Sequence, residues 1–212
     1  EMKKIKLAGV PEQAFIPIKL AQEVGIFSNL GIEVDFVETP EGTGKLLSLV
    51  ESGEVDLALT VTDGFIAGKA KGRDVNLCGT YISSPLVWAC SVGANSKLDN
   101  MGQMASEEAK TGDAKIRWGV SRLGSGSHTM GVYASTNMDV PSQNLDFVVA
   151  DNFKGLRDGA NADKFDAFLW EHFTSKPYWS EDIKHVGDVK TPWPAFSFVE
   201  GKNLAEGTNL TH

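Results

Sequence analysis

The ten residues from Ser121 to Met130 carry the groups best suited to hold an anion. Serine hydroxyls donate hydrogen bonds, glycines leave backbone N–H groups accessible, and Arg122 supplies a positive charge. The stretch follows an apolar run at 116–120 and precedes a helical pattern at 127–137, and the first N–H groups of a helix lack internal partners. We expect an anion-binding turn here, with a Gly/Ser loop that binds nothing as the alternative. Its predicted ligand contacts are Ser121, Arg122, Gly124, Ser125, Gly126, Ser127 and His128.

This turn does not match the common nucleotide-binding or hydrolase motifs. A dinucleotide fingerprint beginning at Gly124 needs a third glycine where the chain has Thr129. Gly44-Lys45 is not a phosphate-binding loop, because Thr39 stands where the first glycine is needed. No serine lies at the centre of a G-x-S-x-G elbow around Gly124. The sequence therefore excludes a dinucleotide fingerprint, a phosphate-binding loop and a hydrolase nucleophile elbow at these positions.

A second polar group, Trp170-Glu171-His172, directly follows the apolar residues Phe168 and Leu169. A Glu and a His at the end of a strand are candidates for ligand contacts or for a general acid/base pair. The alternative is a packed Trp170 beside a solvated Glu171 and His172. If the protein is an enzyme, the catalytic candidates are His172, Glu171 and His128; otherwise there are none.

The four histidines, at 128, 172, 185 and 212, show no metal-ligand spacing, so we expect neither a metal nor a cofactor. Cys78 and Cys90 are too few for a disulfide framework and are expected to be reduced core thiols.

Thr191-Pro192-Trp193-Pro194 is the most rigid stretch of the chain, because each proline fixes its own φ and restricts the residue before it. Such a segment suits a crossover between two units. Trp193 is expected either to stack on a ligand or to fill the hinge.

The composition is that of a globular protein that does not bind nucleic acid. Hydrophobic residues make up 42% of the 212 residues and charged ones 23%, with a net charge of −8 and scattered Lys and Arg. No apolar run approaches the roughly 20 residues of a membrane span. The N-terminus carries no signal-peptide pattern, which suggests a cytoplasmic protein, or a periplasmic or secreted one given in its mature form.

Strand and helix patterns alternate twice along the chain. The first series predicts strands near 5–10, 32–37, 55–61 and 75–81 with helices between them; after a strand at 86–92 and a polar stretch at 95–115, a second series predicts strands at 116–120, 145–149, 165–169 and 195–199. This order indicates an α/β fold with two lobes of mostly parallel sheet. We place lobe 1 at 1–88 plus 192–212 and lobe 2 at 89–191, with the ligand cleft between them.

Ligands of such sheets bind beyond the carboxyl ends of the strands. In the first unit the polar, glycine-bearing turns at these positions supply further predicted ligand contacts. They are Pro11, Glu12, Gln13, Gly42, Thr43, Gly44, Thr62 and Asp63, in addition to Trp170, Glu171, His172 and Trp193 from later in the chain.

Four segments, at 41–44, 52–58, 124–127 and 191–194, resemble the type II periplasmic-binding-protein family, in particular its sulfonate-binding and thiamine pyrimidine-precursor relatives. The W-E-H-F segment at 170–173 and T-P-W-P at 191–194 are similar to the fungal cytosolic members of that fold. The resemblance implies two lobes joined by a hinge of two crossovers that close on a small molecule. Members usually continue with helices beyond the point where this sequence stops. The precursor synthases sacrifice a histidine and carry a cysteine-rich motif, which this chain lacks.

Three functions follow from these expectations. The preferred one is a solute-binding protein for a small polar or anionic ligand, heteroaromatic ligands included. It is expected to act without catalysis and to have no partner beyond that ligand and a weak oligomer. The first alternative is an enzyme of thiamine biosynthesis that handles a pyrimidine precursor derived from vitamin B6. The second is the solute receptor of an ABC transporter.

Overall fold

The computed structural model describes residues 2–201, which form two compact units. Among these residues, unit 1 comprises 2–84 and 193–201, and unit 2 comprises Pro85–Pro192. The predicted lobe boundaries, after residue 88 and before residue 192, fall within the same two strands as these divisions. The part of predicted lobe 1 beyond residue 201 lies outside the described residues.

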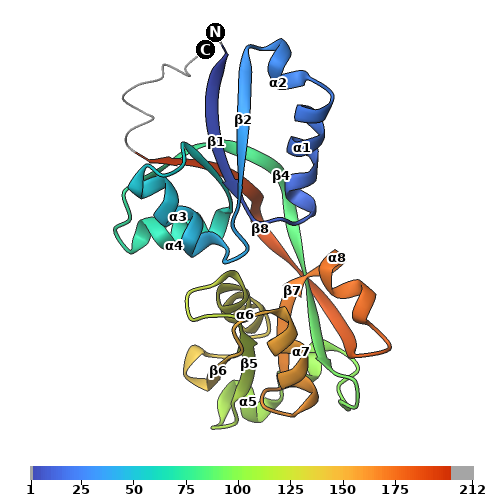
Figure 1. Ribbon diagram of the computed structural model, residues 1–212. Coiled ribbons are helices and arrows are strands. Elements are labelled where there is room, and N and C mark those ends of the chain that lie inside the picture. The colour runs from blue at the N-terminus through green and yellow to red at the C-terminus, as the bar shows by residue number, and fades with distance from the viewer. Residues whose placement is uncertain (1, 202–212) are drawn as a thin grey trace. The chain divides into compact units, whose positions relative to one another are not determined.

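Unit 1 is an α/β unit with helices on both faces of its sheet (Figure 1). Its own elements are β1 (Lys3–Gly9), η1 (Gln13–Phe15), α1 (Ile16–Glu23), α2 (Ile26–Asn29), β2 (Ile32–Glu38), α3 (Thr43–Ser52), β3 (Leu57–Val61) and α4 (Thr62–Ala70). Two further strands, β4 (Val75–Gly93) and β8 (Ile183–Gly201), belong partly to each unit. The strand order is β2-β1-β3-β8, with β1 parallel to β2 and β3, and β8 antiparallel to β3.

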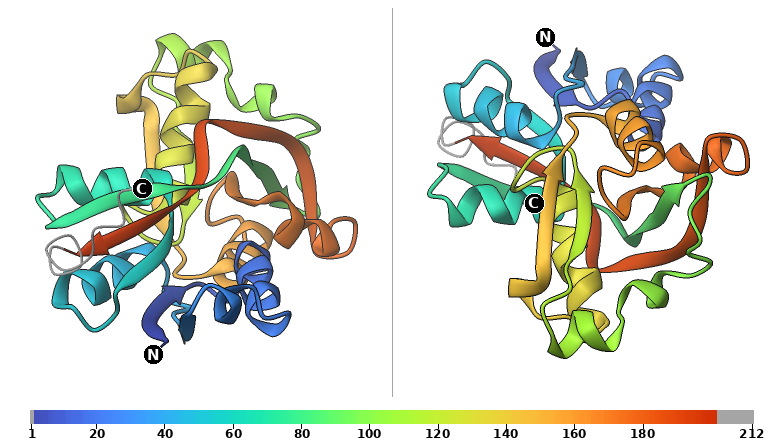
Figure 2. Two further views of the ribbon diagram at one scale, coloured as in Figure 1. Left: turned by 90° about the horizontal axis from the view of Figure 1, so that it is seen from above. Right: turned by 90° about the horizontal axis from the view of Figure 1, so that it is seen from below.

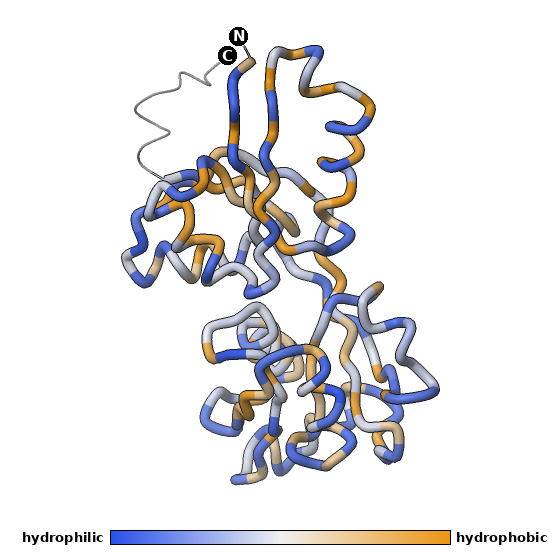
Figure 3. The backbone as a smooth tube through the Cα atoms, viewed as in Figure 1, coloured by the Kyte–Doolittle hydropathy of each residue, from blue (hydrophilic) through white to orange (hydrophobic). Residues whose placement is uncertain are grey.

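Alternation along the strands of unit 1 separates two cores. Leu7 and Leu59 point to the face where Phe15 and Ile18 pack, whereas their neighbours Ala8 and Ala58 point to the face covered by α3 and α4. Figure 3 shows the same alternation of hydrophobic and hydrophilic residues along β2. The sequence therefore buries both faces of this sheet and leaves its carboxyl edge to polar turns.

Unit 2 repeats this organisation. Its elements are η2 (Met101–Met104), α5 (Glu107–Thr111), β5 (Ile116–Val120), α6 (Gly126–Asn137), η3 (Ser142–Asn144), β6 (Leu145–Val149), α7 (Phe153–Asn161), β7 (Ala167–Glu171), α8 (His172–Ser175) and η4 (Lys176–Tyr178). The strand order is β4-β7-β5-β6, in which β5 is parallel to β6 and β7, and β4 is antiparallel to β7. Figure 2 shows β5 and β6 side by side. The predicted α/β fold with mostly parallel strands is confirmed.

Helices α6 and α7 both contact β5 and β7 of unit 2. Trp118 on β5 is completely buried, and its indole N–H donates a hydrogen bond of 2.9 Å to Ser135 Oγ on α6. Phe165 and Phe168 pack with Leu156 of α7 in a second cluster. These contacts fix the helices whose first turns follow the strands.

The strands expected at 75–81 and 86–92 are a single strand in the structure, and the predicted crossover at 191–194 lies inside the long strand β8. The expectation of separate strands is therefore wrong. Proline stops a strand only where its missing N–H would have joined the ladder. Next to Pro85, the Leu86 N–H donates to the Thr191 side chain at 3.0 Å, so the extended backbone continues.

Among residues 2–201, no helix is both long enough and apolar enough to span a membrane. Both cysteines were predicted to be reduced thiols in the core. Cys90 is buried, as predicted, but Cys78 is exposed, so the prediction is wrong for Cys78. Partial burial of its sulfur, followed by the nearby Glu200, nevertheless raises the pKa of the Cys78 thiol to about 12.

Candidate functional site

The predicted ligand contacts lie at the carboxyl edges of the parallel strands. In unit 2 the chain leaves β5 at Val120 and enters the turn before α6, and it leaves β7 at Glu171 and enters α8. In unit 1 the residues after β1, β2 and β3 lead into η1, α3 and α4. Because β1, β2 and β3 are mutually parallel, these three turns share one edge, and the same holds for β5, β6 and β7.

The β5–α6 turn, residues 121–128, is held together by its own hydroxyl groups. Ser125 is the N-cap of α6 and accepts a hydrogen bond from the His128 N–H. Ser127 Oγ accepts from the Ser121 N–H at 3.0 Å and lies 2.9 Å from Ser125 Oγ. The serines that the sequence suggested as ligand donors are therefore already engaged in shaping the turn.

Gly124 and His128 complete this turn. Gly124 adopts φ +80°, a conformation that favours glycine, and its N–H donates to His128 Nδ1 at 3.0 Å. The His128 ring packs edge-on against Phe147, with ring centroids 4.3 Å apart. Because Nδ1 accepts a proton-bearing N–H, the neutral ring carries its hydrogen on Nε2. The Nε2–H group of the neutral His128 ring is therefore a hydrogen-bond donor and not a basic nitrogen.

Arg122 differs from its neighbours in the turn. Its side chain is exposed and makes no hydrogen bond or ion pair with any described residue. Arg117, which lies on β5 just before the turn, instead donates a hydrogen bond of 2.6 Å to Asp166. The β5–α6 turn therefore combines the positive end of the 12-residue helix α6 with a guanidinium that is available to an anion.

The Trp170-Glu171-His172 segment is largely occupied by structural contacts. Trp170 stacks on Phe153 with ring centroids 5.6 Å apart. Glu171 Oε2 accepts hydrogen bonds from the Thr174 N–H at 2.7 Å and from Thr174 Oγ1 at 2.9 Å, which caps α8. The structure gives Trp170 and Glu171 packing and capping contacts, so the acid/base pair that the sequence suggested is not formed between Glu171 and His172.

His172 belongs to a different cluster. Its Nδ1 lies 3.0 Å from Asp188 Oδ1, and His185 Nε2 lies 3.0 Å from the same oxygen. Although partial burial opposes ionisation, these two hydrogen bonds hold the pKa of Asp188 below its usual value. The contact of His172 with His185 and Asp188 was missed in the sequence, since His172 and Asp188 are 16 positions apart and meet only in the folded chain.

In unit 1 the starts of α3 and α4 meet. A Cβ placed on Gly64 would lie 2.7 Å from the Thr43 methyl, which shows how closely these two turns pack. Thr62 Oγ1 lies 2.9 Å from Ser197 Oγ on β8. The turns that carry Thr43 and Thr62, both predicted from the sequence, are therefore packed together. Ser197 contacts Thr62 from β8, where the sequence analysis predicted a strand but no ligand contact.

Asp63 and Thr60 are the buried polar residues of this edge. Asp63 Oδ2 and Thr60 Oγ1 have no hydrogen-bond partner within residues 2–201. Burial raises the pKa of Asp63, against the opposing effects of its own N–H, the Trp193 side chain and the Gly64 N–H. Trp193 thus lies beside Asp63 in unit 1. The carboxyl of Asp63 is therefore partly satisfied by the protein, and its Oδ2 atom stays open to a further donor.

The remaining predicted contacts lie on the same edge of unit 1. Gly42 precedes α3 with φ +82°, and Gly44 is exposed in its first turn. Pro11 and Gln13 are exposed, and the Glu12 carbonyl accepts from the Phe15 N–H at 2.9 Å. We retain all of these residues as proposed contacts.

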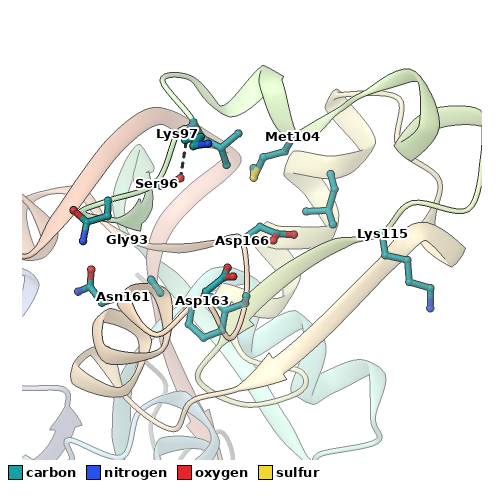
Figure 4. A pocket seen from close by; sticks show the side chains of 13 residues that line it. Gly93, Ser96, Lys97, Met104, Lys115, Asn161, Asp163 and Asp166 are labelled. Carbon is teal, nitrogen blue, oxygen red and sulfur yellow. Dashed lines mark hydrogen bonds between the residues drawn. The ribbon is translucent and has the colours of Figure 1, made fainter.

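A cavity of about 550 Å³ lies elsewhere in unit 2 (Figure 4). It is lined by residues at the end of β4, at the start of β5 and in the loop before β7, including Lys115, Asp163 and Asp166. None of the predicted contacts lines it. This cavity opens at the amino ends of the strands, the opposite edge from the β5–α6 turn.

Two family models match overlapping parts of the sequence. Residues 88–189 match a family described as Ca3427-like PBP, and residues 12–99 match one described as NMT1/THI5 like. The chain is also 32% identical over 84 residues to the 4-amino-5-hydroxymethyl-2-methylpyrimidine phosphate synthase of Schizosaccharomyces pombe. That match covers 40% of this chain and 24% of the synthase.

Solved structures share the fold over nearly the whole chain. The CA3427 gene product of Candida albicans, which exhibits the generic periplasmic binding protein fold, is 36% identical with a TM-score of 0.84, covering 97% of this chain and 65% of that one. The periplasmic aliphatic sulphonate binding protein SsuA of Escherichia coli is 16% identical with a TM-score of 0.73, covering 97% and 67%. This chain therefore spans about two thirds of those proteins.

The predicted resemblance is confirmed by both kinds of comparison. SsuA, which is named as a sulphonate binding protein, shares this fold. The chain has the periplasmic-binding-protein fold and carries the sequence features of the Ca3427-like and NMT1/THI5-like families.

Proposed function

We propose that the protein binds a small molecule with an anionic group, and that the β5–α6 turn of unit 2 receives this group. The observation that carries the proposal is Arg122, an exposed guanidinium without a partner in the described chain, beside the first turn of α6. A sulfonate or phosphate there gains charge-assisted hydrogen bonds from Arg122 and backbone N–H groups.

For the edge of unit 1, taken by itself, we propose contacts to the polar organic groups of a ligand. Asp63 and Thr60 offer unsatisfied buried oxygens, which suit an N–H or O–H donor such as the amino group of a pyrimidine. Trp193, beside Asp63, adds a flat apolar surface. Sulphonate binding by SsuA fits the anionic group alone, and the pyrimidine phosphate in the name of the S. pombe relative fits the combination of an anion and a polar organic body.

A thermal-shift screen of the purified chain tests the proposal. Its probes are ethanesulfonate, 4-amino-5-hydroxymethyl-2-methylpyrimidine phosphate and pyridoxal 5′-phosphate, with inorganic phosphate and sulfate for the anion alone. A ligand at about 100 times its Kd stabilises a protein by about 2.7 kcal/mol, which raises the Tm of a chain this size by roughly 5–10 °C. Failure of every organic probe to raise the Tm above the inorganic anions contradicts the proposal.

The second candidate is an enzyme of pyrimidine-precursor metabolism, which the match of residues 12–99 and of the S. pombe synthase favours. His128 is its best-placed residue, because it lies in the proposed anion turn with Nε2 directed away from the Gly124 contact. Incubation with pyridoxal 5′-phosphate followed by mass spectrometry separates the two functions. A new product or a modified histidine supports the enzyme, and recovery of unchanged reagent and protein supports binding alone.

A further inference from the structure

The triad His172, Asp188 and His185 brings three metal-ligating side chains of unit 2 together. His172 is the first residue of α8, and the other two residues lie on β8. Residues three apart on a regular strand point to opposite faces, yet His185 Nε2 and Asp188 Oδ1 lie 3.0 Å apart. Gly187 between them adopts φ +155°, a local irregularity that turns both side chains to the same side.

The ligand atoms of the triad converge closely enough for one ion. One atom from each side chain lies within 4.8 Å of the other two, and both imidazole nitrogens lie 3.0 Å from Asp188 Oδ1. Tetrahedral ligands about 2.1 Å from Zn²⁺ lie about 3.4 Å apart. The two nitrogen–oxygen separations are thus about 0.4 Å shorter than this spacing, so the side chains must move apart slightly to admit an ion.

Trp179 holds the two imidazole rings in place. Its indole stacks on His185 with ring centroids 4.2 Å apart, and the His172 ring meets it edge-on at 4.9 Å. The rings are thus oriented by packing and not only by their shared carboxylate. The side chains of His172, His185 and Asp188 remain 22%, 29% and 35% exposed, which leaves a path for an ion from solvent.

We infer that the triad binds a divalent first-row transition-metal ion. Two neutral imidazoles and one carboxylate form a borderline donor set that suits Zn²⁺, and three protein ligands leave a fourth position for water. The anion turn and the edge of unit 1 contribute nothing to this site, so the inference stands independently of the proposed function.

Calorimetric titration of the EDTA-treated, dialysed chain with ZnSO₄ tests the inference. Binding of one ion per chain is expected, with a rise in Tm. Replacing a partner of a ligand weakens metal binding by about 10- to 100-fold, so losing a ligand in His185→Gln or Asp188→Asn is expected to weaken it by more than about 100-fold. Asp146→Asn, an exposed acid elsewhere in unit 2, is the matched control and retains the wild-type Kd.

A fluorescence titration with Co²⁺ locates the ion. Paramagnetic Co²⁺ at the triad quenches Trp179, and Trp179→Phe removes that quenching while Zn²⁺ binding persists by calorimetry. Circular dichroism of each variant without metal checks its folding, and Asp188→Asn preserves the side-chain shape. The inference is overturned if no Zn²⁺ binds, or if folded His185→Gln and Asp188→Asn bind it as tightly as Asp146→Asn does.

Discussion

The β5–α6 turn of unit 2 and the β3–α4 junction of unit 1 (residues 60–64) occupy equivalent places in their sheets but use their polar groups in opposite ways. In the turn, Ser125, Ser127 and His128 bind one another and the backbone, and only the cation Arg122 lacks a partner. In the junction, the buried atoms without a hydrogen-bond partner among residues 2–201 are Thr60 Oγ1 and Asp63 Oδ2, although the Trp193 side chain also acts on the Asp63 carboxyl.

This difference indicates a division of labour. A turn whose hydroxyls are satisfied internally is rigid before a ligand arrives, so an anion gains its full hydrogen-bond energy there. Unsatisfied acceptors in the junction lower the free energy of unfolding, because each buried group loses its hydrogen bonds to water without gaining new ones. The same groups are available to recognise a ligand. The following predictions separate these two strategies.

Arg122→Ala is expected to have the largest effect. Loss of a hydrogen bond to a charged group removes about 1.5–3 kcal/mol, which raises the Kd for ethanesulfonate or the pyrimidine phosphate by about 10- to 150-fold. Isothermal calorimetry measures it, with Lys115→Ala as the control, because Lys115 is an exposed cation paired with Asp146. Equal Kd values for the two variants contradict a role for Arg122.

Ser127→Ala is expected to destabilise unit 2 by about 1–3 kcal/mol, because the buried Ser121 N–H loses its acceptor. Urea unfolding measures the change. Ser142→Ala, which removes an exposed hydroxyl, is the control and should leave the free energy of unfolding nearly unchanged. If both variants unfold alike, the turn is not held by its own hydroxyls.

Asp63→Asn is expected to change how stability depends on pH. Because burial raises the native pKa of Asp63 above its ordinary value of 3.8, the native state retains its proton to a higher pH than the unfolded chain. The contribution of Asp63 is therefore fully present below pH 3.8 and is lost as pH rises through the native pKa. Urea unfolding of both forms between pH 3 and pH 7 should show the variant gaining relative stability as pH rises; parallel curves oppose this account.

Thr60→Val is expected to have the smallest effect, and its sign is opposite to that of Ser127→Ala. Replacing an unsatisfied buried hydroxyl by a methyl of the same shape should leave stability unchanged or raise it by up to about 1 kcal/mol. The matched variant Thr62→Val breaks the contact with Ser197 and should lower stability by about 1 kcal/mol. Thermal unfolding of the pair measures both, and a clear loss in Thr60→Val argues for a partner that Thr60 needs.

The sequence predicted best what depends on local pattern. The strands at 116–120 and 145–149 were predicted with the bounds that the structure has, since both are short apolar runs closed by polar turns. Patterning could not reveal that residues 75–93 and 183–201 are continuous strands, because proline is compatible with a strand when its neighbours hydrogen-bond elsewhere. Fold resemblance was recognised from segments spread over the whole chain.

The candidate site was only partly predictable for the same reason. Residues 121–128 were found because one contiguous stretch holds the turn. Glu171 was predicted to be a ligand contact or a catalytic residue, because the sequence does not show that its carboxylate accepts a hydrogen bond from the Thr174 N–H. Asp188 and Ser197 gave no signal, because the tertiary fold places them beside His172 and Thr62, which are distant in the sequence.

The division of the chain also has a consequence for the order of folding during synthesis. Unit 2 is one uninterrupted stretch, Pro85–Pro192, whereas the first unit is interrupted after Ser84 and regains its fourth strand only when β8 is made. Val199 belongs to the core of that unit, and its register with Ala58 joins residues far apart in the chain. During synthesis, all residues of unit 2 are therefore made before the part of β8 that completes the sheet of unit 1. Contacts between residues so far apart in the sequence form slowly.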